Sequence, residues 1–247
     1  MPLATIIHTK KDHIAHITLN RPKANNVINQ QMAQELEEIC RQINQDDDVY
    51  VAIITGAGDT FCGGSELKIE EHRYRPATAI ASIDRPVIAA INGEALGPGL
   101  EMALSCDIRI AADKAHFGLP QVAQGFIPVD GGTQRLPGII GKGKAMELLL
   151  TAETVTAGEA LAIGLVSKVV SLEKLAAEVE TLAQTIASKG PVALRYIKEA
   201  VNKGLDMTLE QGLHLEADLY FLLHTTVDRT EGIKAFLGKR TPRFKGQ

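Results

Sequence analysis

Short apolar runs rich in β-branched residues alternate with amphipathic stretches in the first half of this 247-residue chain. Residues 14–19 alternate in polarity and predict a strand that ends at an Asn-Arg-Pro turn. Residues 49–54 and 86–91 are almost continuously apolar, which is typical of strands buried in a parallel sheet. Residues 30–44 carry a helically spaced apolar stripe and predict an amphipathic helix. Together with a short strand at 108–111, these elements indicate an α/β core.

From residue 142 onward the chain has a helical pattern. We expect helices at 142–151, 157–163, 172–188, 191–203, 208–224 and 229–237. No change of composition marks a linker, so length alone leaves open one large domain or two small ones. The long amphipathic helices near the C-terminus are also typical of contacts between subunits.

Composition and charge exclude several classes of protein. With 45% hydrophobic residues, no apolar run of transmembrane length and a net charge of −4, we expect neither a membrane protein nor a nucleic-acid-binding one. The N-terminus lacks the long apolar segment of a signal peptide. Cys40, Cys62 and Cys106 are few and far apart, which favours a reducing cytoplasm and gives no metal-binding pattern.

Three glycine-rich junctions, at 61–67, 92–101 and 125–133, are the best candidates for a functional site. None matches the glycine patterns of dinucleotide or nucleoside-triphosphate binding. Glycine-rich turns between a strand and a helix can expose main-chain amides to an anion or a polarised carbonyl. The alternative is that the glycines only make tight turns.

The segments around these junctions resemble the crotonase (enoyl-CoA hydratase/isomerase) superfamily. The matching segments are 17–29 (ITLNRPKANNVIN), 61–68 (FCGGSELK), 86–113, 117–170 and 231–240 (EGIKAFLGKR). The resemblance implies an α/β fold with a spiral core of ββα turns over 1–190. It also implies a helical oligomerisation region over 191–247, within a single family domain that forms a homotrimer or a dimer of trimers.

The resemblance also implies an acyl-CoA thioester as the ligand, with coenzyme A entering as part of the substrate and no separate cofactor. The thioester oxygen would lie between two main-chain amides and be stabilised as an enolate. The first amide falls on Ser65. The implied substrate and CoA contacts are Cys62, Gly63, Ser65, Glu66, Leu67 and Lys68, with Phe236 and Lys239 reaching the CoA of a neighbouring subunit.

The second amide of this oxyanion hole falls on Pro98, and proline has no N–H to donate. Two explanations are open: the carbonyl shifts to the amide of Gly97 or Gly99, or the site works with one donor. A proline is also favourable in the first turn of a helix without any role in a reaction.

Glu101 falls on the first of the two glutamates that hydratases of the superfamily use. A glutamate is also favourable near a helix N-terminus for electrostatic reasons alone. The second glutamate falls on Gln121, whose amide can orient water but cannot act as a general acid. This change argues against an unmodified two-glutamate hydratase and against isomerases whose base lies at this position.

Asp130 precedes Gly131-Gly132 and resembles the aspartate of the dihydroxynaphthoyl-CoA synthase branch and of ring-cleaving ketoacyl-CoA hydrolases. It also lies one residue from the catalytic aspartate of epoxyphenylacetyl-CoA isomerase-type enzymes. If Asp130 enters the pocket, it forms a carboxylate pair with Glu101. The alternative is a turn aspartate that caps the following segment.

The expected activity is hydration of an unsaturated acyl-CoA, including a cyclic or dienoyl one. The alternatives are double-bond isomerisation, Asp130-dependent hydrolysis or synthesis of a C–C bond, and a homologue that binds acyl-CoA without catalysis. Residues 69–83 would line the acyl pocket, either as a flexible lid or as a helix over a small substrate.

Overall fold

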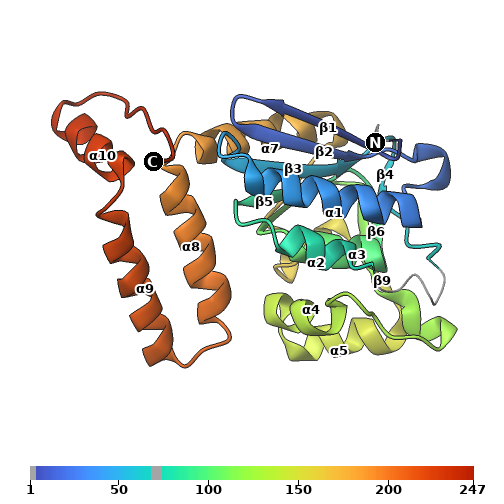
Figure 1. Cartoon of the computed structure of the whole chain (residues 1–247). Helices are drawn as coiled ribbons and strands as arrows, with labels where there is room; N and C mark the ends of the chain where they lie inside the picture. The colour runs from blue at the N-terminus through green and yellow to red at the C-terminus, as the bar shows by residue number, and fades with distance from the viewer. Residues whose placement is uncertain (1–3, 68–73) are drawn as a thin grey trace.

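The computed structural model describes residues 4–67 and 74–247, and its centre is a six-stranded sheet (Figure 1). The strand order is β1-β2-β3-β5-β7-β10. The β1–β2 pair is antiparallel and the other four pairs are parallel. The strands are β1 (Ile6–Lys11), β2 (Ile14–Leu19), β3 (Val51–Gly56), β5 (Val87–Ile91), β7 (Ile108–Ala112) and β10 (Lys168–Val170).

A second sheet, of four short strands, has the order β4-β6-β8-β9. Its members are β4 (Thr60–Cys62), β6 (Glu94–Leu96), β8 (His116–Gly118) and β9 (Thr154–Thr156). The chain passes from β3 to β4, from β5 to β6 and from β7 to β8, so each turn adds one strand to each sheet before a helix follows. This repeated ββα turn is the spiral that the resemblance implies, and the expected fold class is confirmed.

Two long helices cover opposite faces of the large sheet. On α1 (Gln30–Gln45), the apolar stripe of Met32, Leu36 and Ile39 is buried in the larger core, together with Ile17 of β2. On α7 (Leu172–Ala187), Leu175 and Val179 pack into a second core on the other face. Because neighbouring strand residues point to opposite faces, both cores form from the same apolar strands.

Shorter helices surround the second sheet. They are α2 (Pro76–Ala81), α3 (Pro98–Ser105), α4 (Gly132–Ile140), α5 (Lys142–Thr151) and α6 (Ala157–Ala162), with 3₁₀ turns at η1 (Pro22–Ala24) and η3 (Pro120–Gln124). The predicted helices agree with α1 and with α5 to α10 to within two residues at each end. The sequence did not indicate β1 or the short strands of the second sheet.

Three C-terminal helices project from the sheets: α8 (Pro191–Gly204), α9 (Leu209–Leu223) and α10 (Val227–Leu237) (Figure 1). Large apolar side chains on and between them are exposed, among them Leu205, Leu209, Phe221 and Leu237. This is the surface expected of the oligomerisation region over 191–247, and the trimer or dimer of trimers stays a prediction. No helix in the described ranges is both long and apolar enough to cross a membrane.

The loop after β2 is joined to the turn between β3 and β4 by one buried side chain, Asn26. Its Oδ1 accepts a hydrogen bond from the amide of Arg21 at 2.9 Å. Its Nδ2 donates to the carbonyls of Ala57 and Thr60 at 3.0 and 2.7 Å. A Cβ on Gly56 would lie 2.1 Å from the Thr60 oxygen, so this turn closes only around glycine. The contact fixes β4, which leads directly to Ser65.

We predict that Asn26→Ala lowers the free energy of unfolding by about 2–3 kcal/mol, because it leaves buried main-chain groups without partners. Urea denaturation monitored by circular dichroism measures this loss. The exposed Asn202→Ala is the matched control and should change stability by less than about 0.5 kcal/mol. Equal stability of the two variants would contradict a role for Asn26 in holding the turn.

Candidate active site

Helix α3 begins at the second glycine-rich junction, with Pro98 as its first residue. The preceding Gly97 has φ +52°, a conformation that favours glycine. The carbonyl of Gly97 accepts from the amide of Glu101 at 3.0 Å, which starts the helix. A Cβ on Gly99 would lie 2.2 Å from the carbonyl oxygen of Cys62, so the glycine allows α3 to approach β4 closely.

Ser65 forms a parallel bridge with Ile28. The amide of Ile28 donates to the carbonyl of Gly64, and the carbonyl of Ile28 accepts from the amide of Glu66, both at 2.9 Å. In a parallel pair, the residue between these two bonds directs its own N–H to the opposite side. The amide of Ser65 therefore points away from Ile28, as an oxyanion donor requires.

The start of α3 offers fewer amides than the superfamily pattern. Pro98 has none, and the amide of Gly97 donates to the carbonyl of Gly118 at 2.8 Å. Gly97 is therefore engaged, and the expectation that it could replace Pro98 is not supported by this geometry. The amides of Gly99 and Leu100 lie in the first turn, where a helix has no carbonyl of its own to accept them, and the preceding Gly97 has no side chain to cap them.

Glu101 is fully buried one turn into α3. Its Oε1 accepts hydrogen bonds from the main-chain amides of Asp130 and Gly132, at 2.7 and 2.9 Å. Its Oε2 is buried and has no partner among the residues that the structure describes. Burial raises the pKa of this carboxyl, and the two amide hydrogen bonds oppose that shift.

Gln121 lies on η3, across from the start of the same helix. A Cβ built on Gly97 would lie 3.5 Å from its Nε2. Its Oε1 is buried and, like Oε2 of Glu101, has no hydrogen-bond partner in residues 4–67 and 74–247. The first turn of α3 thus has two unpartnered buried acceptors close by, one from a carboxyl and one from an amide.

Asp130 meets Glu101 through its main chain and not through its carboxylate. The carboxylate oxygens accept three hydrogen bonds from α2: from the amide of Ala77 at 2.6 Å, from the amide of Thr78 at 3.1 Å and from the Thr78 hydroxyl at 2.6 Å. Asp130 therefore caps α2 and not α4, the helix that follows it, whose first residue Gly132 donates its amide to Glu101. The sequence did not indicate Thr78, because its contact with Asp130 spans 52 residues.

The expected CoA contacts form two groups. Cys62, Gly63, Glu66 and Leu67 lie around Ser65, where Glu66 pairs with Arg21 at 2.8 Å. The thiol of Cys62 is buried, which raises its pKa to about 12 and makes it unreactive. Lys68 lies outside the described residues. Phe236 is 82% exposed near the end of α10, and Lys239 follows that helix, far from α3 within one chain (Figure 1).

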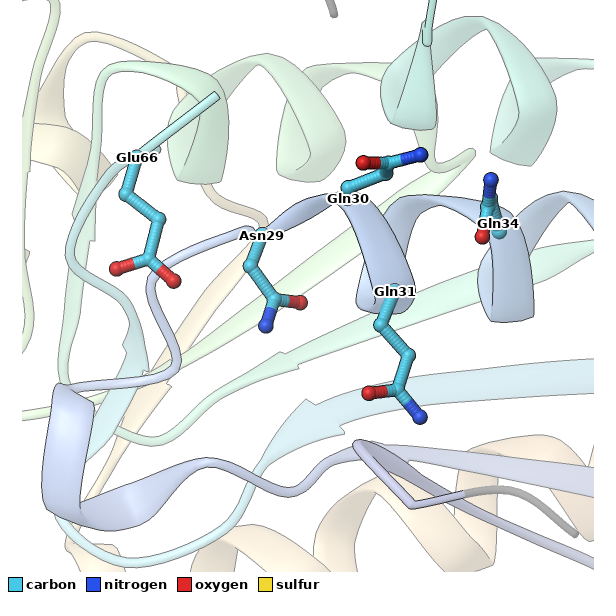
Figure 2. Close-up of a pocket in the computed structure, with 5 residues that line it drawn as sticks. All are labelled: Asn29, Gln30, Gln31, Gln34 and Glu66. Atoms are coloured by element: carbon cyan, nitrogen blue, oxygen red, sulfur yellow. The ribbon is translucent and has the colours of Figure 1, made fainter. Parts of the chain in front are cut away.

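A polar pocket of about 520 Å³, which sequence reasoning missed, lies beside Glu66. Figure 2 shows Glu66 on one side of it and the amide side chains of the first turns of α1 on the other; the lining residues are Asn29, Gln30, Gln31, Gln34 and Glu66. In the described ranges, no three His, Cys, Asp or Glu side chains lie close enough together to hold a metal ion.

Comparisons with known proteins match this architecture. Residues 9–247 match the enoyl-CoA hydratase/isomerase family. The chain belongs to this family. It is 40% identical to the crotonyl-CoA hydratase of Syntrophomonas wolfei, over 99% of both chains. It is 39% identical to the short-chain-enoyl-CoA hydratase of Clostridium acetobutylicum, over 97% of both. The crystal structure of an enoyl-CoA hydratase from Bacillus anthracis superposes with a TM-score of 0.95 at 40% identity, covering 99% of this chain and 100% of that one.

These relatives make the protein an enoyl-CoA hydratase-like enzyme with an acyl-CoA substrate. Neither the acyl group nor the role of a single side chain follows from the likeness. This family member carries Pro98, Gln121 and Asp130 around Glu101, and the geometry of these four residues limits the reactions that the site can catalyse.

We predict that Glu101→Gln is at least as stable as the wild type at pH 8. A carboxyl whose pKa is raised by folding binds its proton more tightly in the folded state, so stability falls as pH rises above the ordinary glutamate pKa. Glutamine keeps the volume and the two amide hydrogen bonds without that penalty. Melting temperatures across pH 4 to 8 test this, about the ordinary pKa range of glutamate and above.

Glu101→Ala is the contrasting variant. It should be destabilised by about 2–4 kcal/mol, because it leaves a cavity and two unpartnered amides. A Glu101→Gln variant that melts well below the wild type at pH 8 would contradict the assignment of Glu101 as a buried carboxyl whose pKa is raised by burial.

Proposed function

We propose that this enzyme adds water across the α,β double bond of an acyl-CoA thioester, with Glu101 as its only proton-carrying carboxylate. The observation that carries the proposal is the pair of unpartnered buried acceptors, Glu101 Oε2 and Gln121 Oε1. A water molecule has two O–H groups to donate, and an acceptor for each would leave its lone pairs free for the β-carbon.

The proton balance of the reaction needs one titratable group. The water oxygen bonds to the β-carbon, its proton passes to Glu101 Oε2, and the electrons of the double bond move into the thioester enolate. Glu101 then returns that proton to the α-carbon. Gln121 cannot ionise, so it orients the water and takes no proton. Burial raises the pKa of Glu101, which brings the proton affinity of its carboxylate closer to what the return step needs.

The thioester oxygen is placed by two main-chain amides. Ser65 supplies the first, because its N–H faces away from Ile28. We assign the second to Gly99: Gly97 already donates to Gly118, Pro98 has no N–H, and Gly99 supplies the next amide at the positive end of α3. Coenzyme A enters with the substrate, and the site needs no further cofactor in this account.

Glu101→Gln should lower kcat for hydration of crotonyl-CoA by about 10²–10⁴, while acyl-CoA binding is retained. Loss of absorbance of the enoyl thioester measures the rate, and calorimetry with butyryl-CoA measures binding. In the wild type, kcat/KM should fall only on the acid side, because Glu101 must be ionised to accept the proton.

Gln121→Glu is the matched variant, since it introduces a second carboxyl of the same size. We expect it to add an alkaline limb to the pH profile, because a general acid must be protonated. A wild-type profile that already has both limbs from two carboxyls would contradict the single-carboxylate mechanism.

Pro98→Gly tests the second donor. If Gly99 holds the thioester oxygen, restoring an amide at residue 98 should change kcat by less than about 10-fold. If the site lacks a donor, the same variant should gain about 10²–10³, the usual effect of one oxyanion donor. Steady-state kinetics with crotonyl-CoA decides between the two, and a gain of that larger size would contradict the assignment of Gly99.

Isomerisation of an enoyl-CoA is the second candidate, because one carboxylate can also move a proton between the γ- and α-carbons. Incubation with a panel of linear, cyclic and dienoyl thioesters followed by mass spectrometry separates the reactions. A mass gain of one water indicates hydration, and an unchanged mass with a moved double bond indicates isomerisation. Tight binding with no product across the panel would contradict both.

A further inference from the structure

We propose that Asp130 is a positioning residue that couples helix α2 to the proton carrier Glu101, and that it is not itself an acid or base of the reaction. The proposal rests on the proposed function, which assigns the proton transfer to Glu101. It gives a role to the carboxylate that distinguishes the third glycine-rich junction of this chain.

The carboxylate of Asp130 is committed to the first turn of α2. Asp130 is 5% exposed, and its two oxygens accept from the amides of Ala77 and Thr78 and from the Thr78 hydroxyl. The amides of a helix's first turn have no partner within the helix, so this carboxylate satisfies two of them and faces the positive end of α2. To act as an acid toward substrate, it would have to release α2.

The main-chain groups of Asp130 form hydrogen bonds with Glu101 and Arg135. The Asp130 amide donates to Glu101 Oε1 at 2.7 Å, and its carbonyl accepts from Arg135 Nη1 at 2.7 Å. Gly131 has φ +106°, and a Cβ there would lie 2.1 Å from Arg135 Nη1. Residue 130 is thus fixed at every polar atom, and it cannot shift without moving Glu101, α2 or both.

Helix α2, which Asp130 caps, is itself held in the core of the protein. It packs on α1 and α3, with Ala77 and Ile80 buried. In the described part of the chain, it is also the first helix after Ser65. Asp130 therefore connects α2, which follows the proposed thioester donor Ser65 along the chain, to Glu101, which carries the proton. The alignment of the thioester with Glu101 depends on this connection.

Asp130 also acts on Glu101 through its charge. The charge of Asp130 raises the pKa of Glu101 in addition to the larger effect of burial, whereas the Arg135 guanidinium lowers it. Among charged side chains, Asp130 and Arg135 have the largest effects on the Glu101 carboxyl. A change that weakened the cap of α2 and kept the Asp130 charge would have no such effect, so the ionisation of Glu101 separates the charge of Asp130 from its packing.

The test compares Asp130→Asn with Thr78→Val. Asp130→Asn keeps the shape, removes the charge and turns an NH₂ group toward a main-chain amide of α2. The pKa of Glu101, followed by carbon NMR of its labelled carboxyl, should fall, and the acid limb of kcat/KM for crotonyl-CoA should move to lower pH. We expect kcat to drop by about 10- to 100-fold, because misalignment is costly. Hydrogen exchange at the amides of Ala77 and Thr78 should accelerate.

Thr78→Val is the control, because it removes one of the three hydrogen bonds and leaves the Asp130 charge. It should leave the pKa of Glu101 and the acid limb in place. Asp130→Asn with unchanged exchange and no turnover at any pH would overturn the proposal and make Asp130 an acid or base. Accelerated exchange with an unmoved Glu101 pKa would overturn the coupling. Exchange and NMR need no turnover, so a protein that hydrates none of the thioesters would refute the proposed function and still test this inference.

Discussion

Oε1 of Glu101 accepts hydrogen bonds from the amides of Asp130 and Gly132, and the rest of the site is arranged around that buried carboxyl. With one oxygen fixed by the main chain, the other has no partner among residues 4–67 and 74–247. Burial is the largest cause that raises the pKa of the group. A carboxyl in this state is unfavourable for stability and favourable for proton transfer, which is the usual compromise at a catalytic centre.

At the first two glycine-rich junctions, 61–67 and 92–101, main chains approach each other closely beside that carboxyl. Gly99 allows α3 to lie against β4, and the bridge between Ile28 and Ser65 turns the Ser65 amide outward. Pro98 has no amide to donate, and the amide of Gly97 already donates to the carbonyl of Gly118. The proposed thioester site therefore uses the amides of Ser65 and Gly99.

Much of the fold and several site residues could be predicted from the sequence, and the features that could not be predicted have physical explanations. The apolar periods of 14–19 and 30–44 specify β2 and α1 because each buries one face. The strands of the second sheet are three residues long, too short for any period to show. The resemblance led to Glu101, which lies one turn into α3, and to Gln121, which lies on η3 across from the start of that helix. The direction of the Asp130 carboxylate could not be predicted, because its partners Ala77 and Thr78 are more than 50 residues away and both donate through their main-chain amides.

The most direct test of the central claim is a crystal structure of the enzyme with butyryl-CoA, which has no double bond to hydrate. We expect the thioester oxygen at about 2.7–3.1 Å from the amides of Ser65 and Gly99. We also expect a water molecule between Glu101 Oε2 and Gln121 Oε1, with the Asp130 carboxylate still on α2. A thioester bound away from Glu101, or a water held by Asp130 in place of Glu101, would contradict the central claim.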